Sequence, residues 1–161
     1  MSISASRLTC TVSESITLNG QQFGNTIQTT HANISEVRQF VTTIPTSEKL
    51  LYKTAASIPT DGSATALELD HDLVQYVRIT NADFGNSLNV LLENEDGDEF
   101  MYKVNPQTSF LLGTHAECME GTTGGADVTI GTYDATSAIT NVSASANTAS
   151  VDIEVFIAIG T

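Results

Sequence analysis

Five carboxylates fall within the seven residues 93–99 of the stretch LNVLLENEDGDEFMYKV, which covers residues 88–104. Apolar residues border this acidic segment on both sides, so the carboxylate oxygens would gather at one place on the surface. Such oxygens are the ligands that hard divalent cations prefer. The segment is therefore the first candidate for chemistry in the chain.

Two hairpin turns compete for this acidic segment. A two-residue turn at Asp96-Gly97 would mix polar and apolar residues on both faces of the hairpin, whereas a three-residue loop, residues 95–97, makes one face apolar throughout. The longer loop also places Gly97 where a type I turn followed by a G1 bulge requires a left-handed residue. We therefore predict the three-residue loop, with the pairs Leu92–Phe100, Val90–Tyr102 and Leu88–Val104 on its apolar face.

The opposite face of the predicted hairpin sets Glu93 against Glu99. Like charges directly across a ladder are destabilising, and a divalent cation would offset the repulsion. A weak cation site would use Glu93, Glu95, Asp98 and Glu99. The calcium-loop pattern fails, because it would begin at Leu92 and end at Lys103. A solvated hairpin tip is the preferred interpretation, and we expect no catalytic residue, no cofactor and no metal.

Two other short motifs have the residue types for metal chemistry. His115-Ala116-Glu117 has the H-x-E form of zinc deaminases, but Cys118 follows directly and no P-C-x-x-C comes after it. Asp70-His71-Asp72 places a histidine between two carboxylates, yet the sequence identifies no further ligand for it. A solvent-facing turn is the preferred interpretation of this second motif.

The charge balance restricts the possible partners. Six Lys and Arg stand against 19 Asp and Glu, giving a net charge of −13. Nucleic acid is disfavoured because phosphate contacts need clustered Lys and Arg, and an anionic membrane surface is disfavoured for the same reason. No run of about 18 apolar residues occurs, and the opening MSISASRLTC lacks the apolar segment of a signal peptide. We expect synthesis in the cytoplasm, with Cys10 and Cys118 as buried free thiols rather than a disulfide.

Alternation of apolar and polar residues, typical of β-strands, dominates the chain. The clearest strand is 151–160, where Val151, Ile153, Val155, Ile157 and Ile159 share one face. Asn19-Gly20 is a strong signal for a type I′ hairpin turn, since both central residues need positive φ. Folding there pairs Leu18 with Gln21, Ile16 with Phe23 and Val12 with Ile27.

The remaining strands are expected between clusters of turn residues. They cover residues 37–44, 49–55, 64–69, 74–81, 87–94, 109–114 and 126–133. About nine or ten short strands indicate an all-β fold, an antiparallel β-sandwich resembling a jelly roll. We expect a single domain over residues 1–161, with a possible N-terminal arm at 1–7 and long loops with short strands at 114–150. A short helical turn could begin at residues 34–37.

Residues 69–114 resemble a pattern in small β-sandwich structural proteins of tailed bacteriophages. The likeness rests on Tyr76 to Asn81 (YVRITN), Asn89 and Val90, the acidic turn, and Pro106 with Ser109 to Leu112 (SFLL). The pattern departs at Gln107, where a glycine is often seen. The resemblance covers less than a third of the chain and implies a component of the virion.

A capsid decoration or cement protein is the function that this resemblance implies. Such a protein would have no enzymatic activity and would bind the major capsid protein or other virion subunits as a homo-oligomer, with a trimer favoured. It would be made in the host cytoplasm and reside in the virion. The alternative is a tail or fibre-associated subunit, or a β-sandwich module that binds glycans or a host surface.

Overall fold

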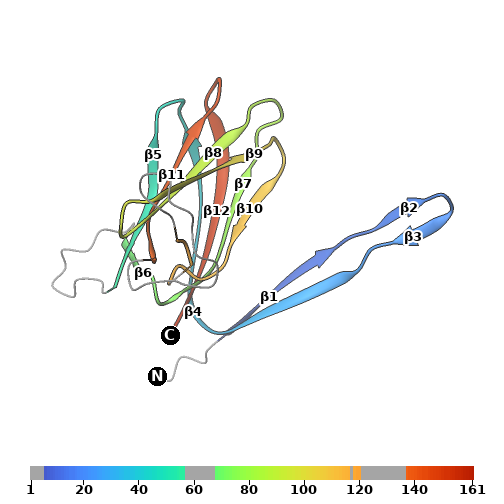
Figure 1. Cartoon of the computed structure of the whole chain (residues 1–161), viewed down its shortest axis with the longest axis horizontal. Coiled ribbons are helices and arrows are strands. Elements are labelled where there is room, and N and C mark those ends of the chain that lie inside the picture. Colours follow the sequence, from blue (N-terminus) through green and yellow to red (C-terminus); the bar gives the residue numbers. More distant parts are fainter. Residues whose placement is uncertain (1–5, 57–67, 117, 121–136) are drawn as a thin grey trace.

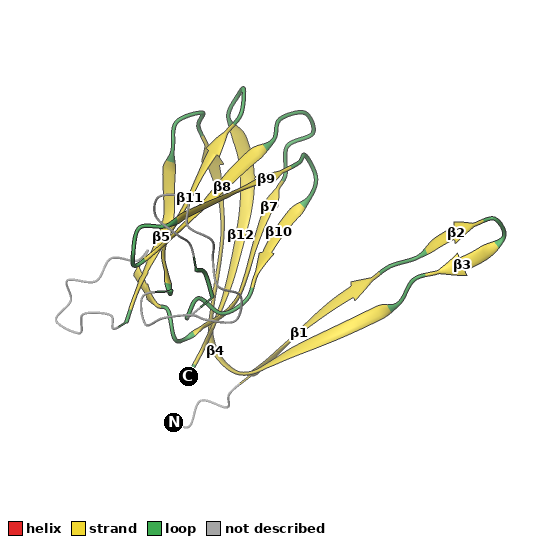
Figure 2. Ribbon diagram, viewed as in Figure 1, coloured by secondary structure: helices red, strands yellow, loops and turns green. Residues whose placement is uncertain are grey.

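The computed structural model describes residues 6–56, 68–116, 118–120 and 137–161. These residues form twelve β-strands and no helix (Figures 1 and 2). Accordingly, no helix among them is long and apolar enough to cross a membrane. The strands are β1 (Ser6–Ser13), β2 (Ile16–Leu18), β3 (Gln21–Phe23), β4 (Thr26–Ile44), β5 (Lys49–Ala55), β6 (Glu68–Asp70), β7 (Val74–Asn81), β8 (Leu88–Asn94), β9 (Glu99–Val104), β10 (Ser109–Leu112), β11 (Ile139–Ala146) and β12 (Val151–Gly160).

Two five-stranded sheets form the layers of a β-sandwich. Their strand orders are β1-β4-β12-β7-β10 and β6-β5-β11-β8-β9, and β2 with β3 forms a separate two-stranded ribbon. All described pairs are antiparallel except the short contact between β5 and β6. The chain crosses between the layers at β4–β5, β6–β7, β7–β8, β9–β10, β10–β11 and β11–β12. This wrapping around two sheets is jelly-roll-like, as the sequence predicted.

The core lies between the two sheets, and β12 contributes its central row. Ile153 and Val155 are 0% exposed and Ile157 is 1% exposed, so the predicted apolar face of this strand is buried. β12 pairs with β4 on one side and with β7 on the other, so it is not an edge strand. Alternate residues of β7, β8 and β11 complete the core from both layers.

One sequence-based expectation is wrong, one becomes more specific, and one is not tested. Residues 26–44 form one strand, so the helical turn considered at 34–37 is wrong: Val37 pairs with Ala158 in the sheet. Within residues 114–150, expected to form long loops with short strands, residues 139–146 form β11, which lies between β5 and β8. This strand was not recognised in the sequence, because small residues such as Ser143 and Ala144 fit a crowded interior but do not produce the alternation of large apolar and polar residues that predicts a strand. The strand expected at 126–133 lies outside the described residues.

Candidate functional site: a hairpin arm and the cleft at its base

A long hairpin projects from the sandwich (Figure 1). β1 pairs with the first half of β4, and β2 pairs with β3 farther out. The predicted pairs Val12–Ile27, Ile16–Phe23 and Leu18–Gln21 are all confirmed. At the tip, Asn19 and Gly20 have φ of 51° and 80°, as a type I′ turn requires. We call residues 6–33 the arm. The hairpin could be predicted from the sequence, but its projection from the sandwich could not.

The arm exposes large apolar side chains to solvent. Ile16 is 60% exposed, Leu18 57% and Ile27 58%, and Val12 and Phe23 are each 49% exposed. A two-stranded ribbon has no second layer to cover such side chains and is at best marginally stable alone. Contiguous apolar surface on a protein usually marks a place where another molecule binds. The arm is therefore the strongest candidate for a binding element in the described part of the chain.

The arm leaves the sandwich at Asn33. This residue has φ of 60°, and the pairing of β1 with β4 shifts register between Leu8–His31 and Ser6–Ile34. A residue in the left-handed region inside a strand bends it, as a β-bulge does. The bend is anchored, because the carbonyl of Asn33 accepts a hydrogen bond from the amide of Thr161 at 3.1 Å. The Ser35 hydroxyl also donates to the carbonyls of Ile159 and Gly160.

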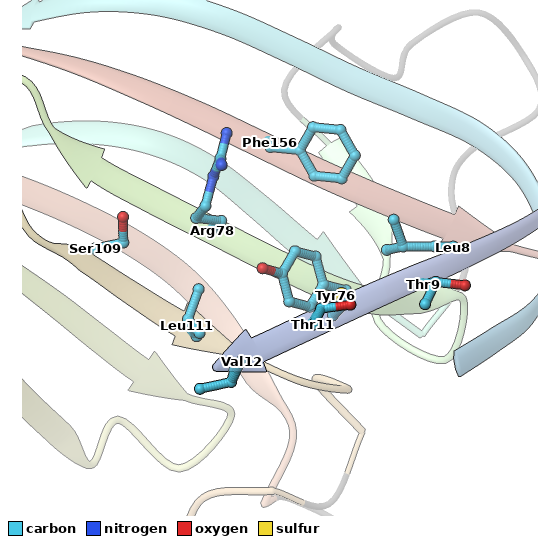
Figure 3. Close-up of a pocket in the computed structure, with 10 residues that line it drawn as sticks. Leu8, Thr9, Thr11, Val12, Tyr76, Arg78, Ser109, Leu111 and Phe156 are labelled. Atoms are coloured by element: carbon cyan, nitrogen blue, oxygen red, sulfur yellow. The ribbon is translucent and has the colours of Figure 1, made fainter. Parts of the chain in front are cut away.

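A cleft of about 430 Å³ opens between the base of the arm and the outer face of the sandwich. Figure 3 shows Leu8, Thr11 and Val12 on β1 facing a wall built by β7, β10 and β12. That wall carries Tyr76, Arg78, Ser109, Leu111 and Phe156. The cleft is therefore mainly apolar, with a few polar groups on its walls.

The polar groups of the cleft wall are held by one another. The Arg78 guanidinium lies 2.6 Å from the Glu154 carboxylate and 5.9 Å from the centroid of the Phe156 ring. Gln39 donates a second hydrogen bond to Glu154 at 2.8 Å. Burial, and then the Cys10 thiol, raise the pKa of Tyr76, while Arg78 acts in the opposite direction. Because the charges of Arg78 and Glu154 offset each other, the cleft wall has little net charge, which favours contact with an apolar surface.

Charge is divided unevenly between the arm and the sandwich. Arg7 and Glu14 are the only Lys, Arg, Asp or Glu side chains in residues 6–33, so the arm has no net formal charge. The remaining residues carry 5 of the 6 basic and 18 of the 19 acidic side chains, a net charge of −13. This absence of charge is visible in the sequence and was the missed signal for the arm.

The acidic turn has the predicted three-residue loop. Leu92 pairs with Phe100, Leu88 with Val104 and Glu93 with Glu99, and Gly97 has φ of 79°. Its carboxylates do not converge, however. Glu93 accepts a hydrogen bond from Asn141, and Asp98 lies against Asn94. The candidate residues Glu93, Glu95, Asp98 and Glu99 form no cluster of potential metal ligands in the described structure.

Glu95 instead points toward the second motif considered for metal chemistry. Its carboxylate lies 3.9 Å from Nε2 of His71, on the turn after β6. Asp70, His71 and Asp72 are the only group of three or more potential metal ligands that the described ranges bring together. Sequence reasoning treated the acidic turn and this motif separately, because residues 71 and 95 are distant along the chain.

His115 of the H-x-E motif belongs to the core rather than to an open site. It is 0% exposed, and its Nε2 lies 2.7 Å from the Tyr52 hydroxyl. Burial lowers the pKa of His115 to about 4, so the ring is neutral. Glu117, the other residue of the motif, lies outside the described residues. Cys10 and Cys118 are free, as predicted, but both are only partly buried.

Comparisons with known proteins found no relative. No protein-family model matches the chain, and no curated protein or solved structure matches it.

Proposed function

We propose that this chain is a structural virion protein of a tailed bacteriophage, a capsid decoration protein that acts by binding neighbouring subunits. The observation that carries the proposal is the arm, which exposes Ile16, Leu18 and Phe23 on a ribbon without a second layer. The bacteriophage assignment rests on the resemblance of residues 69–114 described above. Jelly rolls occur in capsid proteins and in lectins, so the fold is compatible with both the proposal and its alternative.

A second copy of the chain is the first partner of the arm. Two sandwiches of net charge −13 repel each other, whereas an arm with no net charge can approach an acidic neighbour without that cost. The arm and the surface that receives it are different, so the proposed contact is head-to-tail, an arrangement that forms a ring when its rotation closes. The trimer that the resemblance to virion proteins favours would be such a ring. The assembled ring then binds the major capsid protein or another virion subunit.

Analytical ultracentrifugation of wild type, Phe23→Ser and Phe84→Ser tests the role of the arm. Phe23 lies on the arm and is 49% exposed, while Phe84 lies on the loop after β7 and is 88% exposed. The two variants make the same chemical change, which makes Phe84→Ser a matched control. We expect Phe23→Ser to weaken self-association at least about tenfold, as truncation of an interface aromatic does, and Phe84→Ser to leave it unchanged.

Two outcomes contradict different parts of this proposal. A wild-type chain that stays monomeric at all concentrations, or equal behaviour of the two variants, would overturn the arm-mediated contact. Virion membership is tested by mass spectrometry of purified particles of the phage that encodes the chain. Stoichiometric presence supports the proposal, and absence from particles refutes it. A melting temperature that rises with glycans would favour the alternative glycan-binding module.

A further inference from the structure

The turn that follows β6 is fixed by backbone contacts. The amide of His71 donates to the carbonyl of Ala55 at 3.1 Å, and the amide of Leu73 donates to the carbonyl of Asp70 at 3.2 Å. The amide of Asp72 donates to Oδ1 of Asp70 at 3.0 Å. Among the described residues, these backbone contacts occupy only Oδ1 of Asp70, and Oδ1 of Asp72 faces Nδ1 of His71. Three side chains with metal-ligand atoms are thereby held on one short turn.

The imidazole of His71 is buried beside these carboxylates, and its ring nitrogens make no hydrogen bond within the described part of the chain. The residue is 8% exposed, and neither Nδ1 nor Nε2 has a hydrogen-bonding partner. A neutral imidazole always has one N–H donor and one acceptor nitrogen. Leaving such buried groups unsatisfied is unfavourable, and native proteins rarely do so without a functional reason. The described protein atoms therefore supply no hydrogen-bonding partner for either ring nitrogen.

The distances suit a metal ion bound at Nδ1. This nitrogen lies 3.1 Å from Oδ1 of Asp72. Two ligand atoms bound to one ion at about 2.0–2.2 Å each are separated by roughly 3.0–3.5 Å in tetrahedral or octahedral geometry. One ligand atom from each of Asp70, His71 and Asp72 lies within 4.8 Å of the others. The Asp72 side chain is 64% exposed, so it can rotate to shorten those ligand-atom separations that exceed the distance expected around one ion.

Glu95 faces the other side of the imidazole. Its Oε1 lies 3.9 Å from Nε2 of His71. Metal-binding histidines almost always direct their second ring N–H to a carboxylate, a carbonyl or a water, which fixes the tautomer and the ring orientation. With Nδ1 on the metal, Nε2–H would donate toward Glu95. Glu95 is thus a positioning residue and not a ligand.

We propose that Asp70, His71 and Asp72 bind a divalent first-row transition-metal ion, for which Zn²⁺ is the natural probe, and that Glu95 orients His71. An imidazole ligand favours such an ion over Mg²⁺ or Ca²⁺, which prefer sites built from oxygen alone. Three protein ligands leave the remaining positions to water. The ion would lie on the turn after β6, and the contact of His71 with Glu95 would connect that turn to the tip of the β8–β9 hairpin. The site is independent of the arm and of the proposed virion function.

Isothermal titration of the untagged full-length chain with ZnCl₂ tests this site. We expect one saturable site per chain, with affinity reduced at least about tenfold in His71→Gln and in Asp72→Asn. Glu95→Gln should weaken binding by about tenfold through the orientation of the ring. Glu99→Gln is the matched control on the same acidic turn and should bind as wild type does. MgCl₂ should give no saturable binding.

A spectroscopic measurement keeps the test decisive if a variant folds poorly. In the wild-type chain, Zn²⁺ should shift the Nδ1 resonance of His71 in ¹⁵N NMR spectra and leave the resonances of His31 and His115 in place. The proposal is overturned by the absence of saturable Zn²⁺ binding. It is also overturned by undiminished binding in His71→Gln, or by shifts confined to the other two histidines.

Discussion

The Tyr52 hydroxyl lies 2.7 Å from Nε2 of His115, and both side chains are buried in the core. Nδ1 of His115 lies 3.3 Å from the carbonyl of Gly113, which can only accept. Nδ1 therefore carries the proton, and Nε2 accepts from the Tyr52 hydroxyl. Burial raises the pKa of Tyr52 above its ordinary range, so this donor keeps its proton. The pair is a neutral, fully satisfied contact between β5 and the segment after β10.

This contact predicts a loss of stability in acid. The pKa of His115 is lowered from 6.5 to about 4, so the unfolded chain binds a proton in this interval while the folded chain does not. The free energy of unfolding therefore falls as pH decreases from 6.5 to about 4, by at most roughly 3 kcal/mol from this group. Below that interval both states are protonated, and the group contributes no further change.

Chemical denaturation across this pH range checks the prediction in three proteins. His115→Gln retains an acceptor for Tyr52 but does not titrate, so its unfolding free energy should depend less steeply on pH than that of the wild type. His31→Gln, a change to a partly exposed histidine on the arm, should keep the wild-type slope. Equal slopes for wild type and His115→Gln would show that His115 is not the titrating group.

Shortening a central side chain of β12 should create a cavity. Ile153 is 0% exposed and belongs to the core between the sheets. We expect Ile153→Ala to lower the free energy of unfolding by about 2–5 kcal/mol, measured by urea denaturation. Val41→Ala removes apolar atoms from a side chain of β4 that is 73% exposed and should change it by less than about 0.5 kcal/mol. Similar losses in both variants would contradict the described core.

Substitutions at two glycines distinguish the effect of backbone strain from the effect of steric crowding. An added Cβ would meet nothing within 4 Å at Gly97 or at Gly113, but only Gly97 has a positive φ, 79°. We expect Gly97→Ala to destabilise the chain by about 1 kcal/mol and Gly113→Ala to have a smaller effect, as judged from thermal melts. A Gly97→Ala chain as stable as Gly113→Ala would argue against the left-handed turn.

A second pair of glycines tests the conformation of the arm. A Cβ at Gly24 would lie 1.9 Å from the backbone oxygen of Glu14, whereas at Gly20 it would meet nothing within 4 Å. Gly24→Ala should therefore disrupt the contact in which the amide of Glu14 donates to the carbonyl of Asn25. Hydrogen exchange should show faster exchange at the Glu14 amide in Gly24→Ala than in Gly20→Ala.

The melting temperature of Gly24→Ala should change little, because residues 14–25 do not contact the core cluster. A large drop would mean that the arm contributes to the stability of the sandwich. In that case the arm would be an integral part of the fold rather than an element available for binding.

Features fixed by local chemistry could be predicted from the sequence. The two-residue turn at Asn19-Gly20, the three-residue loop ending at Gly97 and the buried face of β12 all follow from positive φ or from period-two burial. β11 was not predicted in its place, because its alanines and serines resemble a loop in composition. Its central position becomes clear only when β5 and β8 are in place on either side.

The candidate sites depended on contacts that the sequence does not display. Burial of His71 and its approach to Glu95 arise from the tertiary fold, since β5 and β11 separate β6 from β8 in the sheet and local sequence signals do not place residues 71 and 95 together. The arm was missed for a different reason. Its alternating residues predict a half-buried hairpin, and alternation does not reveal that the covering layer is missing.

The central position of β12 also constrains how the molecule can form during translation. β4 and β7 each have β12 as a neighbour, yet residues 151–160 leave the ribosome after every other described strand. Until then β4 and β7, which pair with β1 and β10 on their other sides, each lack the partner that joins them into one sheet. The first layer thus closes only at a late stage, which makes the incomplete polypeptide a natural client for chaperones.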